Sequence, residues 1–163
     1  MSIHFNADEI FEMAEQIERN GANFYRKVAG TADEAEVRRV LLELAAMEDE
    51  HEKTFAAMRA QLSAEERISI TFDPEGEAAM YLQAMADGYV FDVRTDPSEL
   101  LTGEEGLADI LHTAIGLEKD SIVFYLGIRD LVPEKFGKGK INDIIKEEMG
   151  HITTLSQKLA SLN

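Results

Sequence analysis

The 163-residue sequence contains no cysteine, no long hydrophobic run and only half as many basic as acidic residues. Without cysteine, disulfides, zinc ribbons, thiol nucleophiles and cysteine-ligated iron are excluded within this chain. No apolar run approaches the roughly 20 residues that a bilayer-spanning helix needs. Residues 1–6 also lack the basic-then-apolar pattern of a signal peptide. We therefore expect a soluble, cytoplasmic protein.

The excess of acidic residues limits the classes of partner that the chain can bind. A net charge of −16 and a pI near 4.5 disfavour binding to nucleic acid or to an anionic membrane, because both would be repelled. Hydrophobic residues make up 45% of the chain, which is enough to bury one compact core. Residues 1–163 are expected to form a single domain.

Hydrophobic and small residues recur at intervals of three and four in two pairs of segments, which is the periodicity of amphipathic helices. The first pair spans about residues 6–62 and the second about 104–162. The intervening stretch, about 63–103, is long enough to cross from one end of a helical bundle to the other, and 77–90 resembles a further short helix. The pattern predicts an all-α four-helix bundle of two antiparallel hairpins joined by a long crossover.

Capping signals support the position of the first hairpin. Asn6 is expected to cap the first helix, whose opening turn is acidic. Gly30 is expected to end that helix, and Thr31 with Glu34 to form a capping box for the next one.

A glutamate and a histidine three residues apart occur at the same place in each hairpin. Glu48 precedes His51, and Glu148 precedes His151, so the motif repeats with a shift of 100 positions (148 − 48 and 151 − 51). Residues three apart on a helix project from one face and can ligate one metal ion together. A single Glu-x-x-His is common in charged helices and carries little information, but two in register indicate a duplicated metal site.

A further glutamate precedes each motif by 30 positions. Glu18 stands before Glu48, and Glu118 stands before Glu148. In an antiparallel hairpin the members of each pair lie level to within about one helical turn, given a rise of about 1.5 Å per residue. All four carboxylates and both imidazoles are therefore expected to converge at the middle of the bundle.

Four ionised carboxylates in a buried site would repel one another at a cost of several kcal/mol each unless counter-charge is supplied. Two divalent cations cancel the charge of four glutamates, and the imidazoles bind as neutral ligands. Two of the glutamates can bridge the metals, while the other two and the histidines complete the two ends. This donor set suits two iron ions or manganese and does not by itself exclude zinc.

Two tyrosines belong to the same repeat. Tyr25 follows Glu18 by seven residues, and Tyr125 follows Glu118 by seven, so each tyrosine lies two turns further along the same helix face. Their hydroxyl groups either donate to the ligand carboxylates or simply fill the core.

Other polar residues near the motif have no counterpart in the other hairpin. His4 and His112 are therefore not expected to be ligands. Four further acids are expected to face water: Glu15, Glu50, Glu52 and Glu147.

These motifs resemble the rubrerythrin branch of the ferritin-like di-iron carboxylate proteins. The resemblance is carried by Ile17–Tyr25 with Glu48-x-x-His51, and by Leu117–Tyr125 with Glu148-x-x-His151. It implies a ferritin-like bundle with a non-haem di-iron centre that reduces hydrogen peroxide, or less often dioxygen. It also implies a cytoplasmic role in defence against oxidative stress and assembly as a homodimer.

The sequence departs from the rubrerythrin pattern in two respects. Rubrerythrins carry a four-cysteine rubredoxin domain that delivers electrons, so in this cysteine-free chain a separate electron-donor protein is expected. Rubrerythrins also commonly have an extra glutamate three residues after the first glutamate of the third bundle helix, where this chain has Ser121. The remaining set of four glutamates and two histidines is symmetric and closer to a ferroxidase-type arrangement.

Three functions are consistent with this sequence. The first is a di-iron oxidoreductase that reduces peroxide with electrons from an external donor. The second is a ferroxidase or iron-handling protein that uses dioxygen. The third is a non-redox bundle that holds zinc or manganese for structural reasons.

Overall fold

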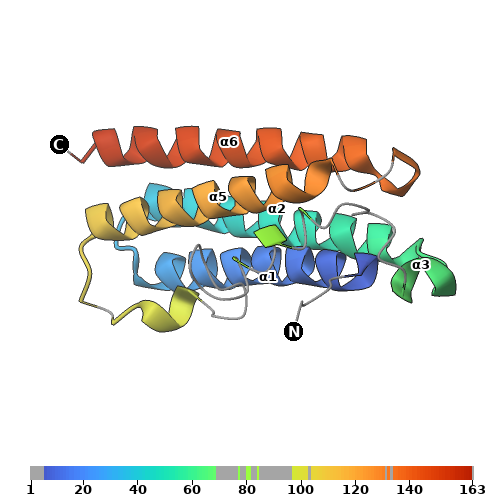
Figure 1. Ribbon diagram of the computed structural model, residues 1–163. Coiled ribbons are helices and arrows are strands. Elements are labelled where there is room, and N and C mark those ends of the chain that lie inside the picture. Colours follow the sequence, from blue (N-terminus) through green and yellow to red (C-terminus); the bar gives the residue numbers. More distant parts are fainter. Residues whose placement is uncertain are drawn as a thin grey trace.

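In the part of the chain that the computed structural model describes, four long helices run side by side along one axis (Figure 1). The predicted all-α bundle of two antiparallel hairpins is confirmed. The structure describes residues 6–68, 77, 80, 81, 84, 97–102, 104–130, 132 and 134–162.

The first hairpin consists of α1 (Ala7–Thr31) and α2 (Ala35–Ala60). The second consists of α5 (Leu107–Arg129) and α6 (Lys138–Ala160). Helix α1 contacts α2 and α5, and α6 contacts α5 and α2, so each long helix has two long neighbours. Figure 1 shows that neighbouring helices run in opposite directions. This is the arrangement of a bundle whose halves are joined by one long crossover.

Shorter elements mark both ends of the crossover. They are the short helix α3 (Ala64–Ile68) and the 3-10 helix η1 (Pro97–Leu100). A second 3-10 helix, η2 (Glu134–Phe136), lies outside the crossover, between α5 and α6. Figure 1 places α3 and η1 at opposite ends of the bundle, so the chain does cross its length. Of the short helix predicted at 77–90, the described residues 77, 80, 81 and 84 are helical, and the others lie outside the described residues.

The start of α1 is as predicted, but its end is not. The Asn6 side chain accepts from the Glu9 amide at 2.9 Å and Glu9 accepts from the Asn6 amide at 2.9 Å, which is a complete capping box. Gly30 does not end the helix, which continues to Thr31. The Thr31 hydroxyl donates to the Val28 carbonyl at 2.9 Å instead of capping α2. A hydroxyl that bonds back to its own helix is not available to the next one.

Glycine sets the start of the fourth bundle helix. Gly137 caps α6 with a φ of 101°, a left-handed conformation that residues with a side chain rarely adopt. The second hairpin can therefore reverse direction within a few residues. Before the third bundle helix, the Thr102 amide donates to Glu105 at 2.7 Å, and α5 begins after Gly106.

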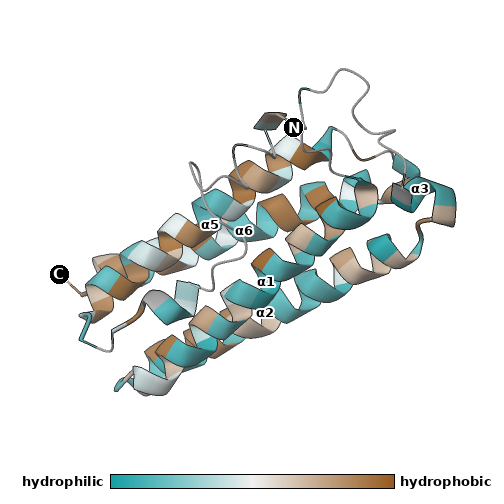
Figure 2. Cartoon of the chain, turned by 60° about the horizontal axis from the view of Figure 1, so that its bottom comes forward, coloured by the Kyte–Doolittle hydropathy of each residue, from teal (hydrophilic) through white to brown (hydrophobic). Residues whose placement is uncertain are grey.

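Among the described residues, hydrophobic side chains form two clusters along the bundle. One contains Phe11, Phe55 and Tyr125, and the other contains Tyr25 and Leu41. Each long helix carries hydrophobic and hydrophilic residues along its length (Figure 2). Among the described residues, no helix combines the length and apolar character that crossing a membrane would require.

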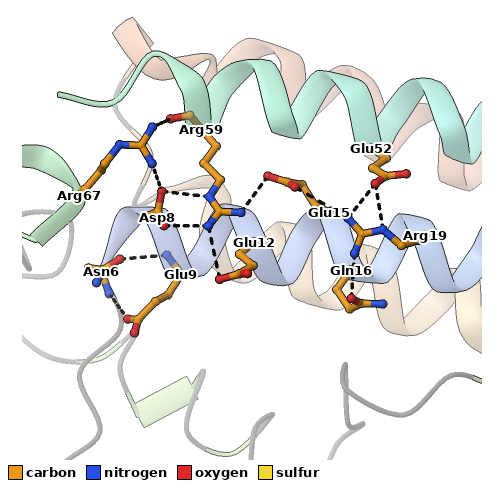
Figure 3. A network of polar contacts seen from close by, with 10 residues as sticks. All are labelled: Asn6, Asp8, Glu9, Glu12, Glu15, Gln16, Arg19, Glu52, Arg59 and Arg67. Carbon is orange, nitrogen blue, oxygen red and sulfur yellow. Dashed lines mark hydrogen bonds and ion pairs between the residues drawn. The ribbon is translucent and has the colours of Figure 1, made fainter. Parts of the chain in front are cut away.

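An arginine near the end of α2 ties three helices together (Figure 3). The Arg59 guanidinium donates two hydrogen bonds to the Asp8 carboxylate of α1, at 2.9 and 2.8 Å, and lies 3.5 Å from Glu15. Arg67 of α3 also bonds Asp8. The guanidinium forks and the carboxylates satisfy one another where α1 begins and α2 ends.

Candidate metal centre

The six residues of the repeated motif meet inside the bundle, two from each of α2 and α6 and one from each of α1 and α5. None of their side chains is more than 4% exposed, although all six are ionisable: Glu18, Glu48, His51, Glu118, Glu148 and His151. Charged residues are almost never fully buried without partners. Their burial therefore requires a compensating charge within the bundle.

These side chains form two overlapping groups. Glu18, Glu48, His51 and Glu148 each offer a ligand atom within 4.8 Å of the others, and so do Glu48, Glu118, Glu148 and His151. Two glutamates, Glu48 and Glu148, belong to both groups. The geometry thus separates two shared carboxylates from two end positions, each with one glutamate and one histidine, which is the pattern expected from the sequence.

The two imidazole rings present the same nitrogen to the carboxylates. His51 Nδ1 lies 3.3 Å from Glu48 and 3.1 Å from Glu148. His151 Nδ1 lies 3.2 Å from Glu48 and 2.9 Å from Glu148. The rings are stacked with their centroids 5.8 Å apart and an angle of 18° between their planes. Each histidine therefore directs Nδ1 toward both shared carboxylates.

The donor atoms fit a pair of metal ions. Both carboxylate oxygens of Glu148 and both ring nitrogens of His151 lack a hydrogen-bond partner within the part of the chain that the structure describes, although they are fully buried. Unsatisfied buried polar atoms are costly and rare, and an ion is one of their recognised causes. Oxygen and imidazole donors in this number suit iron, manganese or zinc.

The two tyrosines connect the hairpins to each other. The Tyr25 hydroxyl donates to Glu118 Oε1, and the Tyr125 hydroxyl donates to Glu18 Oε1. Both phenol rings are buried, and burial together with the nearby carboxylates raises the pKa of each hydroxyl well above its usual value. Of the two roles considered from the sequence, the structure shows a hydrogen bond to a carboxylate, in each case that of the opposite hairpin.

The glutamates of the centre have unequal electrostatic environments. Burial and the neighbouring Glu48 carboxylate raise the pKa of Glu18 well above its usual value. Burial likewise raises the pKa of Glu118 to about 7. Burial and the charge of Glu18 act to raise the pKa of Glu148, but the imidazoles of His51 and His151 close to its carboxylate outweigh them, so that pKa is lowered. In the metal-free centre a proton is therefore held more readily by the end glutamates than by Glu148.

The histidines respond in the opposite way to the same surroundings. Burial alone would lower the pKa of His51, but the carboxylates of Glu148, Glu18 and Glu48 outweigh it and raise that pKa strongly. The pKa of His151 is raised to about 12 by the same balance. In the metal-free chain, protonated imidazoles supply part of the counter-charge that divalent cations would otherwise provide.

The acids expected to face water do not all do so. Glu50 is 71% exposed, as expected. Glu15 is only 12% exposed and lies near Arg59, while Glu52 accepts a hydrogen bond from Arg19 at 3.0 Å (Figure 3).

Glu147 is half exposed but bonds a residue of the centre. Its Oε2 lies 2.7 Å from His51 Nε2, the ring nitrogen that points away from the shared carboxylates. Sequence reasoning missed this contact because Glu147 has no counterpart in the first hairpin. The only available signal was its position beside Glu148, on a helix that packs against α2.

The remaining sequence predictions concern His112, His4 and Ser121. His112 is exposed on α5 and is in neither group of candidate ligands. His4 lies outside the described residues. Ser121 donates its hydroxyl to the Leu117 carbonyl at 3.1 Å, a bond within its own helix.

A four-helix bundle with one long crossover, whose facing helices contribute glutamates and Glu-x-x-His pairs, is the arrangement of the ferritin-like di-iron carboxylate proteins. The family model described as Rubrerythrin matches residues 9–89. A solved structure of a putative ferritin-like di-iron-carboxylate protein from Thermotoga maritima superposes with a TM-score of 0.75 at 25% identity, and the match covers 98% of each chain. A comparison with curated protein sequences gives no match.

On these grounds the chain is similar to rubrerythrin over residues 9–89 and to a ferritin-like di-iron-carboxylate protein over nearly its whole length. The family match covers the first hairpin and part of the crossover, while the structural match extends over both hairpins. These similarities and the buried cluster of carboxylates and imidazoles together support iron binding.

Proposed function

We propose that this protein binds two iron ions between its hairpins and reduces hydrogen peroxide as part of defence against oxidative stress. The observation that carries the proposal is the pair of ligand groups that share Glu48 and Glu148. One end would be completed by Glu18 and His51, and the other end by Glu118 with His151.

A pair of bound ferrous ions would supply the two electrons that convert one hydrogen peroxide and two protons into two waters, becoming ferric. The residues of the chain would orient the ligands of the centre and exclude water from it. The hydroxyl groups of Tyr25 and Tyr125 hold protons against the end carboxylates and so orient them. The two hydrophobic clusters keep bulk water from the buried carboxylates.

The electrons that restore the ferrous state must come from outside the chain. The sequence contains no cysteine, so it has no rubredoxin-type iron site of its own. We infer that a separate redox protein is the electron donor, with peroxide as substrate and the cytoplasm as the site of action.

A second candidate function is ferroxidase activity with dioxygen as oxidant. It is favoured by Ser121, whose hydroxyl bonds Leu117 in its own helix at the position where rubrerythrins commonly carry an extra glutamate. Without that extra glutamate, the four glutamates and two histidines form a symmetric ligand set. In the third alternative, the same residues would hold manganese or zinc for structural reasons, without redox change.

The first experiment is elemental analysis of protein produced in iron-replete cells and purified without oxygen. About two irons per chain are expected, and two zinc or manganese ions would instead favour the non-redox alternative. The diferrous protein is then mixed with one equivalent of hydrogen peroxide or of dioxygen in a stopped-flow spectrometer. Faster oxidation by peroxide supports the proposal, whereas faster oxidation by dioxygen supports ferroxidase activity.

A matched pair of variants distinguishes the effect of losing a buried carboxylate of the centre from the effect of losing a surface carboxylate. Glu148→Gln removes a shared carboxylate, and Glu50→Gln removes an exposed one that lies on α2 and bonds Lys53. Peroxide oxidation should be lost with the first variant and retained with the second. No spectral change on mixing the iron-loaded wild-type protein with peroxide would refute peroxide reduction.

A further inference from the structure

The two histidines of the centre differ in what their outer nitrogens contact. His51 Nε2 lies 2.7 Å from Glu147 Oε2, a carboxylate that reaches from α6 to α2. His151 Nε2 is buried and has no hydrogen-bond partner within the part of the chain that the structure describes. The inner nitrogens, in contrast, face the same two shared carboxylates.

The difference follows from a break in the internal repeat. A shift of 100 positions relates Glu148 to Glu48, but it relates Glu147 to Met47. Met47 is 38% exposed, and its thioether sulfur is only a weak acceptor that carries no charge to hold an imidazole N–H. The duplicated hairpins therefore present equivalent ligands but unequal support for them.

A carboxylate on the outer nitrogen changes what a histidine offers to a metal. It accepts the Nε2 proton, so that the lone pair of the neutral ring is on Nδ1, and it holds the ring in one orientation. It also makes the imidazole a stronger base and hence a better ligand. Loss of such a partner typically weakens metal binding by roughly 10- to 100-fold.

We propose that Glu147 is a positioning residue that makes the two metal positions unequal, so that the position formed by Glu18 and His51 binds a divalent ion more tightly than the position formed by Glu118 and His151. The inference rests on the proposed metal centre but not on the identity of the oxidant. The chain would then fill its two positions in a fixed order.

A control for the charge of Glu147 lies beside it. Glu147 and Glu50 both line a surface groove between α2 and α6 that includes His51. Glu50 is more exposed than Glu147, 71% against 50%, and its carboxylate bonds Lys53 at 2.6 Å rather than a histidine. Removing either residue changes the net charge of the groove equally, but only one change removes a partner of His51.

The test is a titration of the metal-free full-length chain with Co²⁺ in the presence of a competing chelator, followed by cobalt absorption. Wild-type protein should show two separable dissociation constants. Glu147→Met should weaken the tighter constant by roughly 10- to 100-fold, and Glu147→Gln, which keeps an acceptor oxygen, should weaken it less. Glu50→Met should leave both constants within about twofold of wild type, because no ligand loses a contact.

The reciprocal variant tests the same inference by gain rather than loss. Met47→Glu places a carboxylate at the position that corresponds to Glu147 and should tighten the weaker constant. Equal constants in the wild-type protein, or a Glu147→Met variant that changes neither constant or both alike, would overturn the inference while leaving the metal centre intact. A wild-type chain that binds no cobalt would overturn the metal centre and this inference together.

Discussion

Removing one hydroxyl group tests whether the tyrosines join the hairpins as the structure indicates. The Tyr25 hydroxyl donates to Glu118, and the two residues are only 2% and 4% exposed, so water cannot easily replace the lost donor. A hydrogen bond to a charged group contributes roughly 1.5–3 kcal/mol. We expect Tyr25→Phe to lower the free energy of unfolding of the metal-free protein by about 2 kcal/mol.

The assay is urea unfolding of the metal-free chain at pH 8, followed by circular dichroism. At this pH Glu118, whose pKa is raised by burial to about 7, is mostly ionised, so the lost bond is one to a carboxylate. For a slope of about 2 kcal/mol per molar urea, the midpoint should fall by about 1 M. Tyr125→Phe, which removes the equivalent bond to Glu18, should have a similar effect.

A third tyrosine is the control. The Tyr81 hydroxyl donates to the Val123 carbonyl at 2.6 Å, but this bond is exposed to solvent. Tyr81→Phe should therefore cost less than about 1 kcal/mol. If Tyr25→Phe costs no more than Tyr81→Phe, the inter-hairpin bond does not contribute to stability and the reasoning fails.

Four further substitutions test the sharing of Glu148, the Asp8 ion pair and the helical position of Gly150. Glu148→Gln should reduce bound metal toward zero because Glu148 is shared by both positions. Glu18→Gln should leave about one ion per chain, because Glu18 belongs to one position only. Elemental analysis measures both, and equal losses would contradict the sharing of Glu148. The hydrogen bond from Arg59 lowers the pKa of Asp8 below its usual 3.8. The bond therefore stabilises the fold fully above about pH 4, and its contribution is lost as the pH falls through the lowered pKa of Asp8. Asp8→Asn should thus cost about 1 kcal/mol in unfolding experiments at pH 7, with a cost that shrinks at pH 3; a constant cost would refute this linkage. Gly150 is an exposed helical glycine with open space around it, and Gly150→Ala should raise the unfolding free energy by roughly 0.5–1 kcal/mol without altering metal content.

The inner part of the centre could be predicted from the sequence because it depends on helix geometry alone. The spacing from Glu48 to His51 places both residues on one helix face, and its repetition at Glu148 and His151 requires two such faces to meet. The burial of these side chains, at no more than 4% exposure, agrees with that reasoning. Local periodicity was sufficient because each helix had one hydrophobic face on which to place its ligands.

Contacts between helices from different hairpins could not be predicted in the same way. Tyr25 shares a helix face with Glu18 in the sequence, yet it bonds Glu118, because α1 and α5 are neighbours and the second hairpin brings Glu118 within reach of the hydroxyl. Glu147 illustrates the same limit, since only the packing of α6 on α2 brings it to His51. The end of α1 was predicted wrongly because the Thr31 hydroxyl bonds the Val28 carbonyl of its own helix. A capping pattern in the sequence does not show which of two adjoining helices such a hydroxyl will bond.

The position three residues after the first glutamate of each hairpin bears on how the ligands could move. In the first hairpin this residue is Gly21, and a Cβ atom there would lie 3.4 Å from Glu48 Cγ, so the position adjoins a shared carboxylate. In the second hairpin it is Ser121, whose hydroxyl is bonded within its own helix. Neither residue can supply a carboxylate to compete with Glu48 or Glu148. A metal at either end would therefore have no alternative ligand at this position, whereas the contact of Glu147 with His51 is made at one end and distinguishes the two.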